Sequence, residues 1–109
     1  MTLGTCFLFE RAFDPCGNEI KQEVVSPDGK YTATAFIRDC GATTSYSPQV
    51  YLRRTGERMA ETGNVFTGYR SDGINISWVS ATELVIRCSC EVRGYEKEFN
   101  EIVITLNSG

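Results

Sequence analysis

Several short segments of this chain alternate between two kinds of side chain, and this alternation constrains the fold more than any other feature. Within residues 31–37, one face of an extended chain would carry Tyr31, Ala33, Ala35 and Ile37. The same period of two recurs in residues 74–78, 84–88 and 102–106. Because successive side chains of a strand point to opposite faces of a sheet, this period predicts half-buried β-strands. Helical periodicity is scarce, so the chain is expected to be all-β.

The sequence SPDGK at residues 26–30 is the strongest turn signal in the chain. Pro27 presets the backbone angle φ for a type I turn, and Gly29 tolerates the left-handed conformation that follows. Residues 19–25 and 31–38 on either side have strand-like composition. We therefore predict that they pair as a β-hairpin.

Turn signals recur along the rest of the chain and divide it into short segments. Further strands are predicted at residues 48–54, 63–69, 74–80, 84–90 and 99–106, and a loop or hairpin tip at residues 92–98. Six or seven short strands are typical of a small antiparallel sheet, a sandwich or an open barrel. We expect one domain, residues 1–109, with an apolar N-terminal arm at residues 1–15 and a β core at residues 16–106.

The core is expected where the apolar faces of these strands meet. The residues assigned to it are Ile37, Val50, Leu52, Ile76, Trp78, Leu84, Ile86, Ile102 and Ile104.

Composition excludes several classes of function. Histidine is absent, which excludes Ser-His-Asp and Cys-His catalysis within this chain and every histidine-containing zinc site. The net charge of −3 does not suit nucleic-acid binding, which needs a basic surface. No apolar run approaches the roughly 18 residues of a membrane span, so no transmembrane segment is expected. No cofactor is indicated, and the expected partner is a protein or a small molecule.

Five cysteines are many for 109 residues, and such density is typical of chains in an oxidising compartment. Cys16 and Cys40 each lie 12 residues from Asp28, at the centre of the predicted hairpin. Antiparallel pairing brings them close together, and we predict a disulfide between them. Cys88 and Cys90 are interpreted as buried structural thiols. Only this pair is close in sequence, whereas a four-cysteine zinc site would want two such pairs, so no metal is expected.

The stretch RDCGATTSYS at residues 38–47 combines charges, a cysteine, a glycine and several hydroxyls. Three interpretations stay open. It anchors the hairpin through Cys40; it is a binding loop; or Cys40 is a nucleophile that Arg38 activates. The first two are compatible with each other. The residues assigned to the binding loop are Arg38, Asp39, Thr43, Thr44, Ser45 and Tyr46.

The sequence resembles a family of small uncharacterised bacterial proteins. The resemblance is carried by CGNEI (16–20), SPDGKYTATAFIRDCGATT (26–44), QVYL (49–52), GNVF (63–66), Trp78 and ELVIR (83–87). Members of this family often look like exported lipoproteins, which implies the periplasm or the cell envelope. If the chain is complete as written, it lacks the usual leader, which favours the cytoplasm and suggests the product of a mobile gene cassette.

The resemblance implies no known activity. We therefore expect a non-enzymatic binding or interaction module of the bacterial cell envelope, or one derived from an envelope family. The alternative is a small hydrolase or thiol enzyme that uses the 38–47 loop. A sheet this small leaves edge strands unpaired, and such edges invite strand addition, so we also expect a homodimer.

Overall fold

The protein is described by a computed structural model that covers residues 16–41 and 45–107. These residues form nine strands and no helix, which confirms the all-β class. The strands are β1 (Gly17–Val25), β2 (Tyr31–Asp39), β3 (Ser47–Arg54), β4 (Phe66–Tyr69), β5 (Ile74–Ser80), β6 (Glu83–Cys88), β7 (Glu91–Tyr95), β8 (Glu98–Phe99) and β9 (Ile102–Asn107). The predicted N-terminal arm, residues 1–15, lies outside the described residues.

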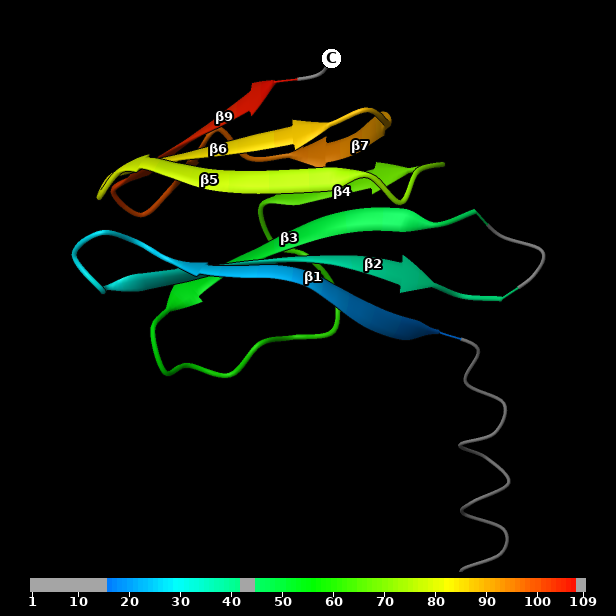
Figure 1. Cartoon of the computed structure of the whole chain (residues 1–109), viewed down its shortest axis with the longest axis horizontal. Helices are drawn as coiled ribbons and strands as arrows, with labels where there is room; N and C mark the ends of the chain where they lie inside the picture. Colours follow the sequence, from blue (N-terminus) through cyan, green and yellow to red (C-terminus); the bar gives the residue numbers. More distant parts are fainter. Residues whose placement is uncertain (1–15, 42–44, 108–109) are drawn as a thin grey trace, which may run out of the picture.

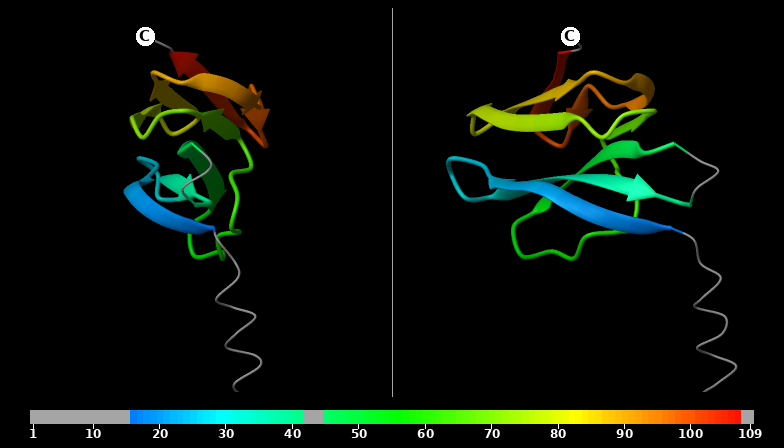
Figure 2. Two further views of the ribbon diagram at one scale, coloured as in Figure 1. Left: turned by 90° about the vertical axis from the view of Figure 1, so that its right-hand side faces the viewer. Right: turned by 45° about the vertical axis from the view of Figure 1, so that its right-hand side comes forward.

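The strands form two sheets that pack against each other. The five-stranded sheet has the order β1-β2-β3-β4-β7, and the four-stranded sheet has the order β5-β6-β9-β8. Figure 1 shows β1, β2 and β3 in one layer and β5, β6 and β9 in the other, and the turned views of Figure 2 show the same two layers. Neighbouring strands are antiparallel except for β6 and β9, which are parallel. The chain leaves the four-stranded sheet after β6, forms β7 in the other sheet, and returns, so β9 runs in the direction of β6.

The predicted hairpin is confirmed, since β1 pairs antiparallel with β2. Its turn has the expected chemistry. Gly29 has a φ of 79°, a left-handed value that glycine adopts without steric cost, and its N–H donates to the Ser26 carbonyl at 2.8 Å. The Asp28 carboxylate accepts from the Ser26 hydroxyl at 2.7 Å and from the Lys30 backbone N–H at 3.1 Å.

The predicted core lies between the two sheets. Eight of the nine residues assigned to it are buried: Ile37, Val50, Leu52, Ile76, Leu84, Ile86, Ile102 and Ile104. Trp78 is only partly buried and packs at the margin of the core, where its indole N–H donates to the Val24 carbonyl at 3.1 Å. Ala33 and Ala35 of β2 are fully buried in the same core.

The outer face of β2 is covered as well, which the sequence pattern does not predict. Phe36, on the opposite face from the core, is fully buried. The connection between β3 and β4, residues 55–65, folds back over this side of the sheet (Figure 1). It returns at Gly63, where an added Cβ would lie 2.6 Å from the Phe66 carbonyl oxygen and 2.7 Å from that of Val50. A side chain at position 63 would therefore push the connection off the sheet.

One segment differs from expectation. Residues 92–98 were predicted as a loop, but β7 occupies Glu91–Tyr95 and β8 begins at Glu98. The segment is polar because β7 is an edge strand with an exposed face, so it lacks the apolar alternation of a half-buried strand. Together with the separate β8, it raises the number of strands to nine within the described residues. Within residues 16–41 and 45–107, no helix is long and apolar enough to cross a membrane.

Candidate functional site

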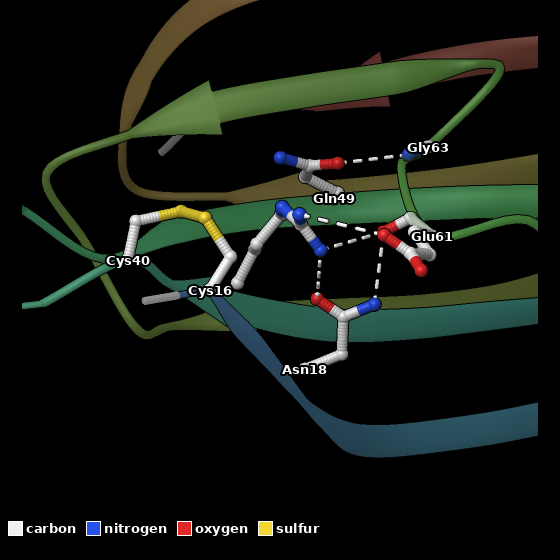
Figure 3. Close-up of polar contacts among 7 residues, drawn as sticks. Cys16, Asn18, Cys40, Gln49, Glu61 and Gly63 are labelled. Carbon is white, nitrogen blue, oxygen red and sulfur yellow. Dashed lines mark hydrogen bonds and ion pairs between the residues drawn. A yellow bond between two sulfur atoms is a disulfide. The ribbon is translucent and has the colours of Figure 1, made fainter. Parts of the chain in front are cut away.

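Cys16 and Cys40 are joined at the base of the β1–β2 hairpin. Their sulfur atoms are 2.02 Å apart and their Cα atoms 3.8 Å apart, and Figure 3 shows the bond beside the start of β1. The register explains the proximity, because Gly17 pairs with Asp39, the residues just inside the two cysteines. The cysteines are therefore neighbours at the open end of the hairpin, as the spacing around Asp28 predicts.

Arg38 belongs to a second contact beside this disulfide, the Arg38 clamp, which consists of Arg38, Asn18 and Glu61. One guanidinium nitrogen of Arg38 donates to the Asn18 side-chain oxygen at 2.9 Å and to the Glu61 carbonyl at 3.1 Å. The Asn18 amide also donates to that carbonyl at 2.8 Å, as Figure 3 shows. The clamp thus ties the 55–65 connection to both strands of the hairpin.

Two further contacts hold the same connection. The Gly63 backbone N–H donates to the Gln49 side-chain oxygen at 2.8 Å (Figure 3). The Asn64 side chain bonds both backbone groups of Leu52, accepting from its N–H and donating to its carbonyl, each at 2.8 Å. Residues of CGNEI, RDCGATT, QVYL and GNVF therefore meet in one structural network. Much of this sequence pattern is accounted for by the fold.

Two adjoining pockets border the described parts of the 38–47 stretch, at Asp39 and Tyr46. One, of about 470 Å³, lies along the start of β1 and is lined by Cys16, Gly17, Asn18, Glu19, Lys21, Ile37, Asp39, Tyr46 and Asp72. The other, of about 760 Å³, is lined by Asp39, Gly41, Ser45, Tyr46, Arg70, Ser71 and Asp72. Both pockets include Asp39, Tyr46 and Asp72, so we treat them together as the Asp39–Asp72 cleft. Its volume is in the range of small-molecule sites.

The predicted loop residues divide between the two sides of the sheet. Asp39, Ser45 and Tyr46 line the Asp39–Asp72 cleft. Arg38 lines neither pocket, because consecutive strand residues point to opposite faces and its guanidinium is held in the clamp. Thr43 and Thr44 lie outside the described residues.

Sequence reasoning missed the far wall of the cleft, which is formed by Arg70, Ser71 and Asp72. No functional role was predicted for any of these residues from the sequence. The backbone N–H of Arg70 donates to the Tyr46 carbonyl at 2.8 Å, so the turn is attached directly to the 38–47 stretch. Charged residues are common beside turn signals, so nothing in the sequence indicated that this turn contacts Tyr46.

Arg70 also has an unusual backbone. Its φ is 68°, in the left-handed region that a long side chain seldom adopts. Such conformations persist where the surroundings fix them, and they concentrate at functional sites. The Arg70 side chain is 70% exposed and lies 3.8 Å from the Glu91 carboxylate. It therefore stands at the rim of the cleft with most of its surface available to a ligand.

Two carboxyl groups of the framework, those of Glu23 and Asp28, have lowered pKa values. The pKa of Glu23 lies below its ordinary value mainly because Arg53 hydrogen-bonds its carboxylate, with a second bond from Thr34. The pKa of Asp28 is lowered chiefly by the Ser26 hydroxyl. Both groups stabilise the β1–β3 part of the sheet.

The interpretation of Cys88 and Cys90 as thiols was wrong. Their sulfur atoms are bonded at 2.13 Å, with Cα atoms 5.3 Å apart. Strand β6 ends at Cys88, and the chain turns there toward β7. The strand alternation that would hold the two side chains in a row is therefore interrupted, and they meet.

A family model described as "Family of unknown function (DUF5412)" matches residues 6–97. No curated protein and no solved structure matches the chain.

Proposed function

We propose, for a chain that belongs to the family of unknown function DUF5412, a role as a non-enzymatic binding module of the bacterial cell envelope. The observation that carries the binding role is the Asp39–Asp72 cleft. Two pockets meet there over the same three side chains. The residues come from the end of β2, the start of β3 and the turn before β5, so a rigid two-sheet scaffold holds loop residues around a concave surface.

The chemistry of the cleft favours a polar ligand that donates hydrogen bonds. The carboxylates of Asp39 and Asp72 are acceptors when ionised. Tyr46 is about half exposed and offers an aromatic face for a flat or apolar part of the ligand. Ser45, Ser71 and Arg70 add donors at the rim. Ligands with ammonium, guanidinium or several hydroxyl groups fit this arrangement.

The proposal that the 38–47 stretch is not a thiol active site is supported by the state of Cys40. A thiol enzyme needs a free thiolate as nucleophile, but the Cys40 sulfur is bonded to Cys16. The guanidinium of Arg38, which was the expected activator, is engaged by Asn18 and Glu61. The alternative of a thiol enzyme that uses this stretch therefore has no available nucleophile in the disulfide-bonded protein.

The envelope location is supported by the two disulfides of the described residues, because disulfides persist in oxidising compartments. The resemblance to exported lipoprotein-like proteins is consistent with it. Blocking free thiols in intact bacteria that carry the natural gene, followed by peptide mapping, tests the location. We expect Cys16 and Cys40 to resist alkylation until a reductant is added. Alkylation of both before reduction would contradict the envelope assignment.

Binding is tested by NMR titration of the full chain with two probes, a trilysine peptide and an N-acetylglucosamine trisaccharide. We expect at least one probe to shift the backbone resonances of Asp39, Tyr46 and Asp72. Tyr46→Ala should then weaken that binding by about tenfold or more, as the loss of an aromatic contact at a binding centre does. Tyr51→Ala is the matched control, since Tyr51 lines neither pocket. Shifts confined to other surfaces, or none with either probe, would contradict the assignment.

We propose that the predicted homodimer forms through the exposed face of the four-stranded sheet, not through a strand edge. Edge pairing has little support, because bulges protect strand edges and the edge strands β1, β5 and β7 each show a register shift in their pairing. The fourth edge strand, β8, has only two residues. Val79 and Val103 of the four-stranded sheet are 63% and 47% exposed and could contact a second copy. Light scattering checks this, and a dimer mass that falls to a monomer mass in Val103→Lys is the expected result.

A further inference from the structure

The second disulfide has a position that stability alone does not explain. Cys88 and Cys90 are separated by one residue, whereas Cys16 and Cys40 are 24 positions apart. A cross-link restricts the unfolded chain in proportion to the logarithm of the loop that it closes. The Cys88–Cys90 bond closes the smaller of the two loops, so it contributes less to stability through this mechanism than Cys16–Cys40 does.

The bond lies where the chain passes from β6 of one sheet to β7 of the other (Figure 1). Cys88 is buried, at 2% exposure, and Cys90 is partly exposed. The Cys90 sulfur packs against Gly68 of β4, where an added Cβ would lie 2.7 Å from it. Cys88 and Cys90 therefore differ in exposure as whole residues, and the missing side chain at position 68 makes room for the Cys90 sulfur.

The surroundings of Cys88 favour its reduced form. The Cys88 sulfur lies 3.4 Å from the Gly73 carbonyl oxygen. A disulfide sulfur carries no proton, whereas a thiol can donate to this oxygen. Reduction therefore adds a hydrogen bond that the disulfide form lacks. A pair whose reduced form is stabilised is a stronger oxidant.

A pocket also opens beside the pair. It has a volume of about 380 Å³ and is lined by Gly73, Ile74, Asn75, Arg87, Cys88, Ser89 and Asn107. It shares no residue with the Asp39–Asp72 cleft. Arg87, which is exposed, contributes a positive charge to this pocket.

We propose that Cys88-Ser89-Cys90 is a thiol–disulfide exchange site that oxidises dithiols. A substrate thiolate attacks the sulfur of Cys90, the more exposed residue of the pair, and forms a mixed disulfide. The Cys88–Cys90 bond breaks, and Cys88 leaves as a thiolate, takes up a proton and donates to the Gly73 carbonyl. The second thiolate of the substrate then attacks its own sulfur in the mixed disulfide and releases Cys90. The substrate loses two electrons and two protons, which the two cysteines gain.

The order of reduction of the two disulfides tests the proposal on the wild-type chain. The oxidised protein is equilibrated in mixtures of reduced and oxidised glutathione, quenched with acid, alkylated and mapped by mass spectrometry. We expect the Cys88–Cys90 pair to be half reduced under conditions at least about tenfold less reducing than those needed for Cys16–Cys40, as befits the more oxidising of two pairs. Equal reduction midpoints for the two disulfides, or an earlier reduction of Cys16–Cys40, would overturn the proposal.

Single variants test the direction of attack. With oxidised glutathione, Cys88→Ser should form a glutathione adduct at Cys90 at least about tenfold faster than Cys90→Ser forms one at Cys88, because access limits exchange. Equal rates would contradict attack at Cys90. Oxidation of a synthetic dithiol peptide should yield one peptide disulfide per wild-type chain and none from Cys88→Ser. If circular dichroism shows that Cys88→Ser does not fold, the proposal is judged by the reduction midpoints of the two disulfides in the wild-type chain. None of these measurements depends on a ligand in the Asp39–Asp72 cleft.

Discussion

Replacing Arg38 separates a framework role from a binding role. Its guanidinium makes two hydrogen bonds, to Asn18 and to the Glu61 carbonyl, and an ion pair with the Glu61 carboxylate at 3.8 Å. Hydrogen bonds to charged groups contribute about 1.5–3 kcal/mol each. Both bonds leave from one nitrogen and lie at an exposed site, so the low end of this range applies. The ion pair adds little, because the Glu61 side chain is 84% exposed.

Arg38→Ala should therefore lower the free energy of unfolding by about 2 kcal/mol, which corresponds to a fall in Tm of about 8 °C for a domain of this size. Urea unfolding followed by the fluorescence of Trp78, the only tryptophan, measures the change. The midpoint should fall while the slope m stays constant. Arg38→Lys, which keeps the charge and one donor, should recover part of the loss. A ligand in the part of the Asp39–Asp72 cleft that Ser45, Arg70 and Ser71 line, away from Asn18, should bind Arg38→Ala as it binds the wild type. If Arg38→Ala kept wild-type stability but lost ligand binding, the reasoning would be refuted, and Arg38 would be assigned to the binding site.

Two other predictions concern the framework. Ile104→Ala removes a side chain that is 1% exposed and should cost roughly 2–5 kcal/mol in urea unfolding; a loss below about 0.5 kcal/mol, typical of surface positions, would show that β9 faces the other way. The pKa of Glu23 is lowered from 4.5 in the folded state, mainly by Arg53, so the stability that this pair contributes is present above that value and is lost as the pH falls below it toward the folded pKa. Glu23→Gln should therefore flatten the fall in stability on the acid side of 4.5. It should cost at most about 1 kcal/mol at neutral pH, because half of the Glu23 side chain is exposed. A wild-type acid slope in Glu23→Gln would rule out this contribution.

The sequence by itself determined the features that depend on neighbouring residues. The SPDGK turn requires only a proline, a glycine and capping oxygens within five positions, and it formed as predicted. The strand period of two identified most of the buried residues between the sheets. The proximity of Cys16 and Cys40 also follows from local information, because an antiparallel hairpin with a known centre fixes which residues are opposite each other.

The tertiary structure decided what depends on how separate segments pack. Period-two alternation says which face of a strand is apolar, but not which sheet the strand joins, so the parallel pairing of β6 with β9 and the place of β7 could not be predicted. It also does not predict that residues 55–65 fold back over the outer side of the sheet, or that Phe36 is buried on that side.

The same limit applies to the candidate site. The sequence marked Asp39, Ser45 and Tyr46, but the cleft exists because the turn at residues 70–72 packs against Tyr46. That contact joins segments more than twenty positions apart, at the neighbouring ends of the paired strands β3 and β4. Local propensities do not contain this information, because the same turn residues would suit many other positions in a β fold.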